Sequence, residues 1–226
     1  MSLARGEILG SAWLIGSGRT EMLRTMFGLD ALAGGCLVVC GIETAKAPPW
    51  VRIRQGFGLL SEDRQGEGLA LALSLADNIT LSCFRPYLRY GLLRVGRQEK
   101  AAGDWIGKLN IKARSPLQKV LSLSGGNQQK VALARLLHQQ ADVLLLDEPT
   151  RGIDVVSKAQ IYGWIGELAS QAKAVLFVSS YLPELMGICD RIAVFHRGSL
   201  VDVREAPGWT AQSLMAAVTV GRASGG

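Results

Sequence analysis

Short apolar runs alternate along the chain with segments whose apolar residues recur at helical spacing. Strands are predicted for the runs at residues 8–15, 36–40, 56–60, 143–146, 174–178 and 192–195, the last two being the final strands. Helices are predicted over residues 19–27, from Gly126 to about Gln139, and over 156–169, and Gly28 is a natural end for the first. Residues 76–118 have weaker helical periodicity and predict a small helical subdomain. The alternation predicts an α/β fold with a mainly parallel sheet.

Composition and charge limit the classes of protein to which this chain can belong. The chain has 226 residues, of which 48% are hydrophobic, enough for one large domain or two small ones. No stretch reaches the roughly 18 apolar residues of a membrane-spanning helix, and the first residues lack the apolar core of a secretion signal. The net charge of +6 is concentrated in residues 85–119, which carry nine Lys or Arg and two acids. This basic segment fits either a solvated helical face or a face for an acidic partner, nucleic acid or anionic lipid.

The four cysteines indicate neither a disulfide framework nor a metal site. They are too few to staple a chain of this length, and no Cys or His cluster has zinc spacing. Cys36 and Cys40 enclose an apolar run, so their thiols are expected to be buried. The cysteine usage and the absence of a signal indicate a reduced, cytoplasmic protein.

The first predicted strand runs into a glycine turn that opens a helix. Unsatisfied backbone N–H groups and the helix dipole favour an anion at such a place. The phosphate-binding pattern G-x-x-x-x-G-K-[ST] falls on residues 13–20, which include Gly16, Ser17, Gly18, Arg19 and Thr20. Trp13 replaces the first glycine and Arg19 replaces the lysine, whose compact ammonium a guanidinium does not reproduce. Alone, this motif is weak, and a glycine turn without a ligand is the alternative.

Two later segments are far more specific. Leu-Ser-Gly-Gly-Asn-Gln at residues 123–128 opens a predicted helix, and Leu-Leu-Leu-Asp-Glu-Pro-Thr at residues 144–150 ends an apolar strand in two carboxylates, Asp147 and Glu148. The carboxyl ends of strands form the edge where α/β proteins bind ligands. The first carboxylate suits Mg²⁺, and the second suits orienting or deprotonating a water that attacks a phosphoryl group.

These segments resemble the nucleotide-binding domain of ABC transporters, from Gly6 to about Arg222. The resemblance is strongest to the C-terminal half of the double ATPase subunit of monosaccharide importers, the ribose/xylose/galactose type. It is carried by residues 16–21, 61–64, 124–130, 151–154, 179–180, 183–184 and 214–217. It implies one domain over residues 4–226, with a P-loop NTPase (RecA-like) core at 4–75 and 128–226 and a helical subdomain at 76–127. Since the family's N-terminal antiparallel β-subdomain is missing, we interpret the chain as a fragment of a longer one.

The resemblance also implies roles for individual residues. Glu148 and Ser180 would be catalytic, with Ser180 at the position of the switch histidine of other ABC domains. Thr20 and Asp147 would hold the metal. The nucleotide would contact Gly16, Ser17, Gly18, Arg19, Thr20, Glu62 and Asp147, with Glu62 in place of the Q-loop glutamine. A head-to-tail partner would meet Asp154 of the D-loop and the signature residues Ser124, Gly125, Gly126, Asn127 and Gln128.

The implied function is that of an ATP-binding and hydrolysing half-subunit of a sugar importer. It would donate its signature in trans, while its own ATP site is degenerate and the isolated chain is weakly active or inactive. The implied cofactors are ATP and Mg²⁺. The implied partners are the N-terminal ATPase half of the same parent chain, transmembrane permease subunits and, indirectly, a periplasmic sugar-binding protein. The implied location of this chain is cytoplasmic, at the inner face of the plasma membrane. No nucleic acid is implied as a partner. Two alternatives remain: a non-hydrolysing structural or regulatory half, and a nucleic-acid-linked ABC ATPase, which the lack of sustained heptads disfavours.

Overall fold

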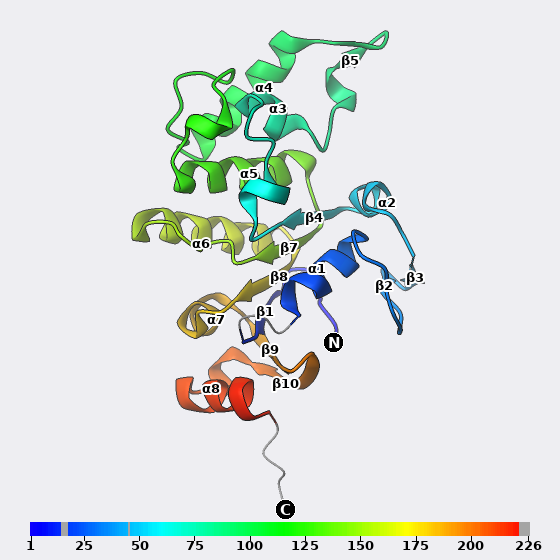
Figure 1. The fold of residues 1–226 in the computed structure, drawn as a ribbon, viewed down its shortest axis with the longest axis vertical. Coiled ribbons are helices and arrows are strands. Elements are labelled where there is room, and N and C mark those ends of the chain that lie inside the picture. The colour runs from blue at the N-terminus through cyan, green and yellow to red at the C-terminus, as the bar shows by residue number, and fades with distance from the viewer. Residues whose placement is uncertain (15–17, 45, 222–226) are drawn as a thin grey trace, which may run out of the picture. The chain divides into compact units, whose positions relative to one another are not determined.

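The computed structural model describes residues 1–14, 18–44 and 46–221. The chain is divided into two compact units (Figure 1). Unit 1 comprises Met1–Leu59, Asp142–Pro149 and Gln160–Gly226, and unit 2 comprises Leu60–Ala141 and Thr150–Ala159. Two residues expected at the phosphate-binding turn, Gly16 and Ser17, lie outside the described ranges.

Unit 1 is centred on a six-stranded sheet in the order β10-β9-β1-β8-β7-β4. Its strands are β1 (Ile8–Ala12), β4 (Phe57–Leu60), β7 (Val143–Asp147), β8 (Ala174–Ser179), β9 (Arg191–His196) and β10 (Ser199–Glu205). β1 runs parallel to β8 and β9, and β7 runs parallel to β8, so the predicted parallel α/β sheet is confirmed. The prediction that the strand at 192–195 is the last is wrong, because β10 follows it as an antiparallel edge.

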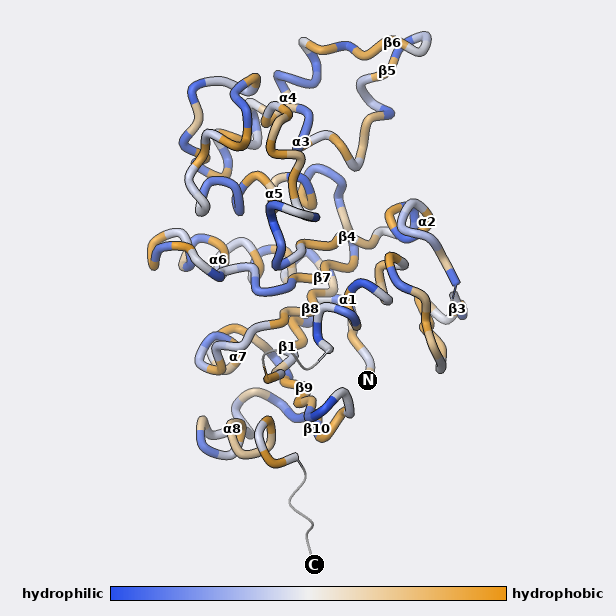
Figure 2. The backbone as a smooth tube through the Cα atoms, viewed as in Figure 1, coloured by the Kyte–Doolittle hydropathy of each residue, from blue (hydrophilic) through white to orange (hydrophobic). Residues whose placement is uncertain are grey.

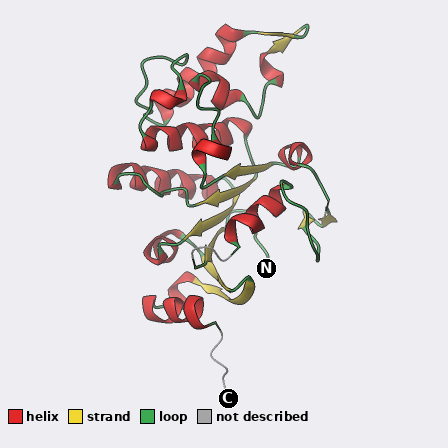
Figure 3. Cartoon of the chain, viewed as in Figure 1, coloured by secondary structure: helices red, strands yellow, loops and turns green. Residues whose placement is uncertain are grey.

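Helices lie on both faces of this sheet (Figure 3), which explains why its central strands are apolar on both sides. α1 contacts β7, whereas α7 contacts β1 and β8 and α8 contacts β9; Figure 1 shows α1 on one side and α7 and α8 on the other. The helices are α1 (Arg19–Phe27), α2 (Pro49–Arg54), α6 (Val155–Ser170), which begins in unit 2, α7 (Leu182–Ile188), η4 (Ala206–Gly208) and α8 (Ala211–Val220). The predicted helix over 19–27 is confirmed, and Gly28 ends it in the left-handed conformation at φ +83°.

The strand predicted at residues 8–15 is shorter, because β1 ends at Ala12. Trp13 then turns into the core of unit 1, where its indole stacks on Phe195 with ring centroids 4.0 Å apart and planes 8° apart. Both rings belong to a buried cluster that joins β1, β7, β8 and β9 to Leu23 of α1. The position of the first glycine in the phosphate-binding pattern is therefore a core position.

The apolar run at residues 36–40 is not a buried strand. Only Val38–Val39 forms a strand, β2, which pairs with β3 (Ile42–Glu43) around a turn with positive φ at Cys40 and Gly41. Val39 packs partly against the core of unit 1, but Val38 and Ile42 are exposed, so most of this short hairpin faces solvent. Cys36 and Cys40 are therefore exposed free thiols, and the expectation that they are buried is wrong.

Unit 2 is built on three helices, of which α3 contacts both α4 and α5. Its elements are η1 (Arg64–Gly68), α3 (Leu75–Thr80), η2 (Arg85–Tyr87), β5 (Leu88–Arg89), β6 (Leu92–Leu93), α4 (Val95–Lys108), η3 (Val120–Ser122) and α5 (Gly125–Gln139). A capping box between Ser74 and Asp77 fixes the start of α3. Among all helices of the described ranges, none has both the length and the apolar character needed to cross a bilayer.

Candidate functional site

Helix α1 begins at a glycine that leaves room in front of it. Gly18 is the N-cap, with φ +98°, and within the described residues no side chain caps the first turn. A Cβ placed on Gly18 would meet no described atom within 4 Å. The first-turn N–H groups and the dipole of this nine-residue helix form an arrangement that favours an anion.

Arg19 and Thr20, the first residues of α1, reach the end of β7. Arg19 Nη1 donates to Glu148 Oε1 at 2.7 Å, and Arg19 Nε lies 3.8 Å from Asp147 Oδ1. Thr20 Oγ1 donates to Asp147 Oδ2 at 2.9 Å. Arg19 and Glu148 are each only 6% exposed. The positive charge at the lysine position of the phosphate-binding pattern is thus paired with the carboxylates at the strand end.

Glu148 is held by both its backbone and its side chain. Its φ of +45° is unusual for a residue with a side chain, and its N–H donates to Val178 O at 2.9 Å. Its Oε1 accepts hydrogen bonds from Arg19 Nη1 and from the Ser180 backbone N–H, each at 2.7 Å. These two hydrogen bonds fix the orientation of the carboxylate at the end of β7.

Asp147 has the surroundings of a metal-binding carboxylate. Burial raises its pKa above the ordinary value, and the hydrogen bond from Thr20 and the charge of Arg19 offset part of that rise. Within the described residues its buried Oδ1 accepts no hydrogen bond. A carboxylate beside a hydroxyl provides the hard oxygen ligands that Mg²⁺ takes, usually with phosphate and water oxygens completing the shell. Asp147 and Thr20 therefore fit Mg²⁺, although the described residues hold no group of three or more His, Cys, Asp or Glu arranged for a metal.

The second group of candidate residues lies in unit 2, at the start of α5. Ser124 is the N-cap, and its Oγ accepts from Asn127 Nδ2 at 2.8 Å. Asn127 Oδ1 accepts from Lys112 N at 2.8 Å, and the buried Gln128 side chain donates to two carbonyls of the preceding segment, at residues 120 and 123. Asn127 and Gln128 therefore fix the loop from which the two glycines of the signature enter the helix.

Arg64, which the sequence motifs leave without a role, fixes the first turn of α5. Its Nη1 donates to Gly125 O at 2.9 Å, and a Cβ on Gly125 or Gly152 would lie 3.6 Å from its guanidinium. A Cβ on Gly126 would lie 3.6 Å from Asp154 Oδ2. Arg64 belongs to segment 61–64, one of the segments that carry the family resemblance. Nothing in that segment indicates that Arg64 contacts a helix far along the chain.

Glu62 and Asp154 also have partners within unit 2. Glu62 forms an ion pair with Arg151. Asp154 Oδ1 accepts from Ser157 N at 2.9 Å, and hydrogen bonds from Ser157 hold the pKa of this carboxyl below its ordinary value. The candidate residues thus divide between the units. Unit 1 holds Gly18, Arg19, Thr20, Asp147, Glu148 and Ser180, and unit 2 holds Glu62, Ser124, Gly125, Gly126, Asn127, Gln128 and Asp154.

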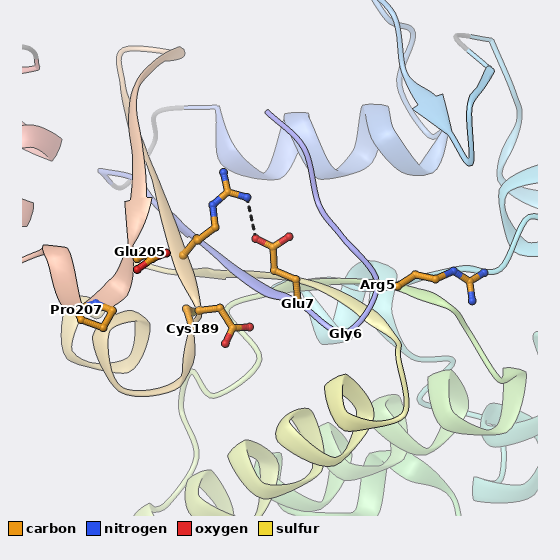
Figure 4. A pocket seen from close by; sticks show the side chains of 8 residues that line it. Arg5, Gly6, Glu7, Cys189, Glu205 and Pro207 are labelled. Carbon is orange, nitrogen blue, oxygen red and sulfur yellow. Dashed lines mark hydrogen bonds and ion pairs between the residues drawn. The ribbon is translucent and has the colours of Figure 1, made fainter.

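A cavity of about 580 Å³ in unit 1 lies away from these residues (Figure 4). It is lined by residues 5–7, 189–191, 205 and 207, at the amino ends of β1 and β9, whereas Asp147 lies at the carboxyl end of β7. Glu7 pairs with Arg191 at 2.9 Å, the contact dashed at Glu7 in Figure 4. The lining of this cavity includes none of the candidate residues, so the cavity is not part of the candidate site.

The parallel sheet, the helix N-terminus after β1 and the carboxylates that end β7 define a nucleotide-binding α/β protein of the P-loop class. The ABC transporter family matches residues 1–151. The fold is similar to a nucleotide-free ATP-binding cassette from an ABC transporter (TM-score 0.77, 17% identity, 91% of this chain and 83% of that one). It is also similar to a dimeric cassette in a post-hydrolysis state bound to ADP and Pi (TM-score 0.79, 22% identity, 92% and 89%). The chain belongs to the ABC transporter family.

Individual relatives indicate which branch of this family the chain resembles. The chain is 43% identical over 216 residues to the ribose import ATP-binding protein RbsA of Chromobacterium violaceum, and 42% identical over 225 residues to RbsA of Lactococcus lactis. These matches cover 96% and 98% of this chain but 43% and 45% of the relatives, so the chain spans less than half of their length. The resemblance to ATP-binding proteins of sugar importers is confirmed.

Proposed function

We propose that the chain is an ATP-binding half of an ABC importer for a monosaccharide, and that it completes its partner half's ATP site with its signature helix. The similarity to ribose import ATP-binding proteins supports the first part. The second part rests on the state of the chain's own site, where Arg19 holds the Glu148 carboxylate. Among the described residues α5, like α1, begins without a capping side chain, so the signature helix can present its first turn to a phosphate.

In the chain's own site, the phosphates of ATP would lie before the N-terminus of α1. Backbone N–H groups of Gly16, Ser17 and Gly18 would bind them, and Arg19 would add a positive charge. Thr20 and Asp147 would hold Mg²⁺, which neutralises charge on the phosphate oxygens when bound. Glu62 would take the place of the glutamine that other ABC domains present to the nucleotide.

Glu148 is the general base of this proposal. Its carboxylate would take a proton from the attacking water, which requires Arg19 to release Oε1 first. The Ser180 N–H keeps the carboxylate oriented, but the exposed Ser180 hydroxyl cannot carry the positive charge of a histidine. With Trp13 in the core as well, the chain's own site would hydrolyse ATP slowly or not at all.

In the partner's site, Ser124, Gly125 and Gly126 would present donors to the terminal phosphate of ATP bound by the partner half. Asn127 and Gln128 would act by fixing the loop, and Asp154 would lie in the contact between the halves. That partner would be the N-terminal ATPase half of the parent chain. The assembly would lie on the cytoplasmic side of the plasma membrane with permease subunits and, indirectly, a periplasmic sugar-binding protein.

We also assign residues 4–226 to one ATP-binding domain, with its core at 4–75 and 128–226 and its helical subdomain at 76–127. Under this assignment the helical subdomain would end in the signature, at the first turn of α5.

The test is steady-state ATP turnover of the parent transporter carrying Gly126→Asp. A carboxylate at this helix start would repel the partner-bound phosphate by several kcal/mol, so turnover should fall by about 100-fold or more. Gly163→Asp is the matched control, because Gly163 is exposed on α6 and a Cβ there meets no described atom within 4 Å. Arg19→Ala should cost less than Gly126→Asp. If Arg19→Ala is the more damaging change, the chain's own site is the working one and the in-trans proposal is wrong.

A non-hydrolysing structural or regulatory half is the second candidate, and the Arg19–Glu148 ion pair favours it. Glu148→Gln in the parent transporter separates the two. A hydrolysing site should lose a measurable part of total turnover, whereas a structural half should leave turnover unchanged. Binding of Mg-ATP to the isolated chain should be weaker than micromolar under either candidate.

A further inference from the structure

Residues 85–97, hereafter the basic hairpin, form an exposed surface of unit 2. Figure 1 shows β5 in a loop that extends beyond α3 and α4. Every residue from Arg85 to Arg97 is exposed except Tyr87. Tyr90 and Leu92 are the most exposed apolar side chains of the hairpin, at 91% and 74%.

The apolar side chains of the hairpin have no packing role that the structure reveals. Leu88 lies opposite Leu93, and Arg89 lies opposite Leu92, so leucines stand on both faces of the hairpin. Both central turn residues have positive φ, +51° at Tyr90 and +79° at Gly91. Asn, Asp or Gly would suit the first of these positions better than tyrosine. Neither the turn nor the core of unit 2 therefore accounts for an apolar tip.

The base of the hairpin is fixed to the helices of unit 2. Tyr87 is buried, and its hydroxyl lies 3.0 Å from Nε2 of His138 on α5. Arg94 N donates to Tyr87 O at 2.8 Å and closes the base. The tip is therefore presented from an anchored base.

The charge of the hairpin has one sign. It contains Arg85, Arg89, Arg94 and Arg97, and residues 78–98 include no Asp or Glu. In the described part of the chain, no carboxylate forms an ion pair with these four arginines. The Arg89 guanidinium lies 5.3 Å from the centroid of the Tyr90 ring. Figure 2 shows hydrophobic and hydrophilic positions alternating along this loop.

We propose that the basic hairpin binds an anionic lipid surface, with its tip at the level of the headgroups. Arginines attract anionic headgroups, while tyrosine and leucine side chains favour the polar–apolar boundary. Leucines on both faces of a two-stranded hairpin give a protein partner no single apolar face to pack against, whereas a fluid headgroup layer can surround both faces. The inference is independent of ATP chemistry, so it can fail while the proposed function stands.

The test is co-sedimentation of the 226-residue chain with vesicles, either equimolar phosphatidylglycerol and phosphatidylcholine or phosphatidylcholine alone. Binding is expected only to the anionic vesicles. Arg89→Gln with Arg94→Gln should lower the partition coefficient by about 25-fold, at roughly fivefold for each arginine. Tyr90→Ser with Leu92→Ser should also lower it, by about tenfold or more.

The matched control is Lys112→Gln with Arg114→Gln, which removes the same charge from exposed positions of unit 2. This control should bind within about threefold of the unchanged chain. The hairpin variants alter only exposed side chains, so they should fold normally. Thermal unfolding midpoints equal to that of the unchanged chain check this. Three results would overturn the proposal. The first is no binding to anionic vesicles, and the second is an equal loss of vesicle binding in the control. The third is unchanged vesicle binding by hairpin variants that nevertheless do not assemble with the permease subunits. The third would assign the hairpin to a protein partner.

Discussion

The buried contact between Arg19 and Glu148 predicts a large coupling energy. The two side chains meet at 2.7 Å with 6% exposure each, so solvent screens them little. Arg19→Met leaves the buried Glu148 carboxylate without its cationic partner, with the Ser180 N–H as its remaining donor among the described residues, and should lower the free energy of unfolding by about 3–5 kcal/mol. Glu148→Gln keeps an acceptor for Arg19 and should cost less, about 1–3 kcal/mol. The double variant should cost less than the sum of the two, with a coupling energy of about 2 kcal/mol.

Urea unfolding followed by tryptophan fluorescence measures this cycle. Four of the five tryptophans, at positions 13, 50, 164 and 209, belong to unit 1, where the pair lies. The signal therefore follows the unit that the variants change. A coupling energy below about 0.5 kcal/mol, the range of independent sites, would refute the reasoning. The two charges would then be solvated separately, and the Arg19–Glu148 ion pair would contribute too little free energy to hold the Glu148 carboxylate in the chain's own ATP site.

Three further predictions concern other contacts. Trp13→Ala should lower the free energy of unfolding by about 3–5 kcal/mol, because it removes a buried indole stacked on Phe195; urea unfolding measures this. Burial lowers the pKa of His138, so between that pKa and 6.5 the unfolded state binds more protons and stability falls with falling pH. Denaturation from pH 7.5 to 5 should show a smaller slope for His138→Gln than for the unchanged chain. Arg64→Met should lower stability by about 1 kcal/mol and speed amide exchange in the first turn of α5, because Gly125 O loses its donor.

Matched variants give two of these predictions a control. Trp50→Ala removes an exposed tryptophan and should change stability by less than about 1 kcal/mol. Arg114→Met, at an exposed arginine, should leave the exchange of α5 unchanged. Equal costs for the two tryptophans, an unchanged pH slope in His138→Gln, or equal exchange for the two arginine variants would contradict the respective prediction.

Local patterns were sufficient to predict much of the sheet and its helices. The helix over 19–27 and the strand ending at Asp147 follow from apolar spacing and from Gly28 as a stop. β10 could not be predicted in this way, because its residues are mostly polar or exposed and it is held by pairing with β9. The prediction of buried thiols at Cys36 and Cys40 is wrong because an apolar stretch does not show which of its side chains pack: Val39 contacts the core, while both thiols are exposed.

The candidate site was predictable as a set of residues but not as a set of contacts. Asp147 and Glu148 could be recognised from their place after an apolar strand. Their partners lie far along the chain, as with Arg19, which is 129 residues from Glu148. The sequence likewise marks Trp13 only as a missing glycine, while its function in the core depends on Phe195.

The central place of β1 in the sheet has a consequence for how the protein is made. This strand leaves the ribosome before the other strands of its sheet, yet its neighbours β8 and β9 come much later in the chain, and the Ile8 N–H bonds to Asp190, 182 residues later. Contacts of such long separation slow folding, and an unpaired apolar strand can associate with other chains while it waits. Unit 1 cannot complete its sheet until nearly all of its residues have emerged, whereas residues 60–141 of unit 2 emerge earlier and need no strand from the first segment. A translation pause before β8 would therefore prolong the exposure of the strand that leads into the phosphate-binding turn.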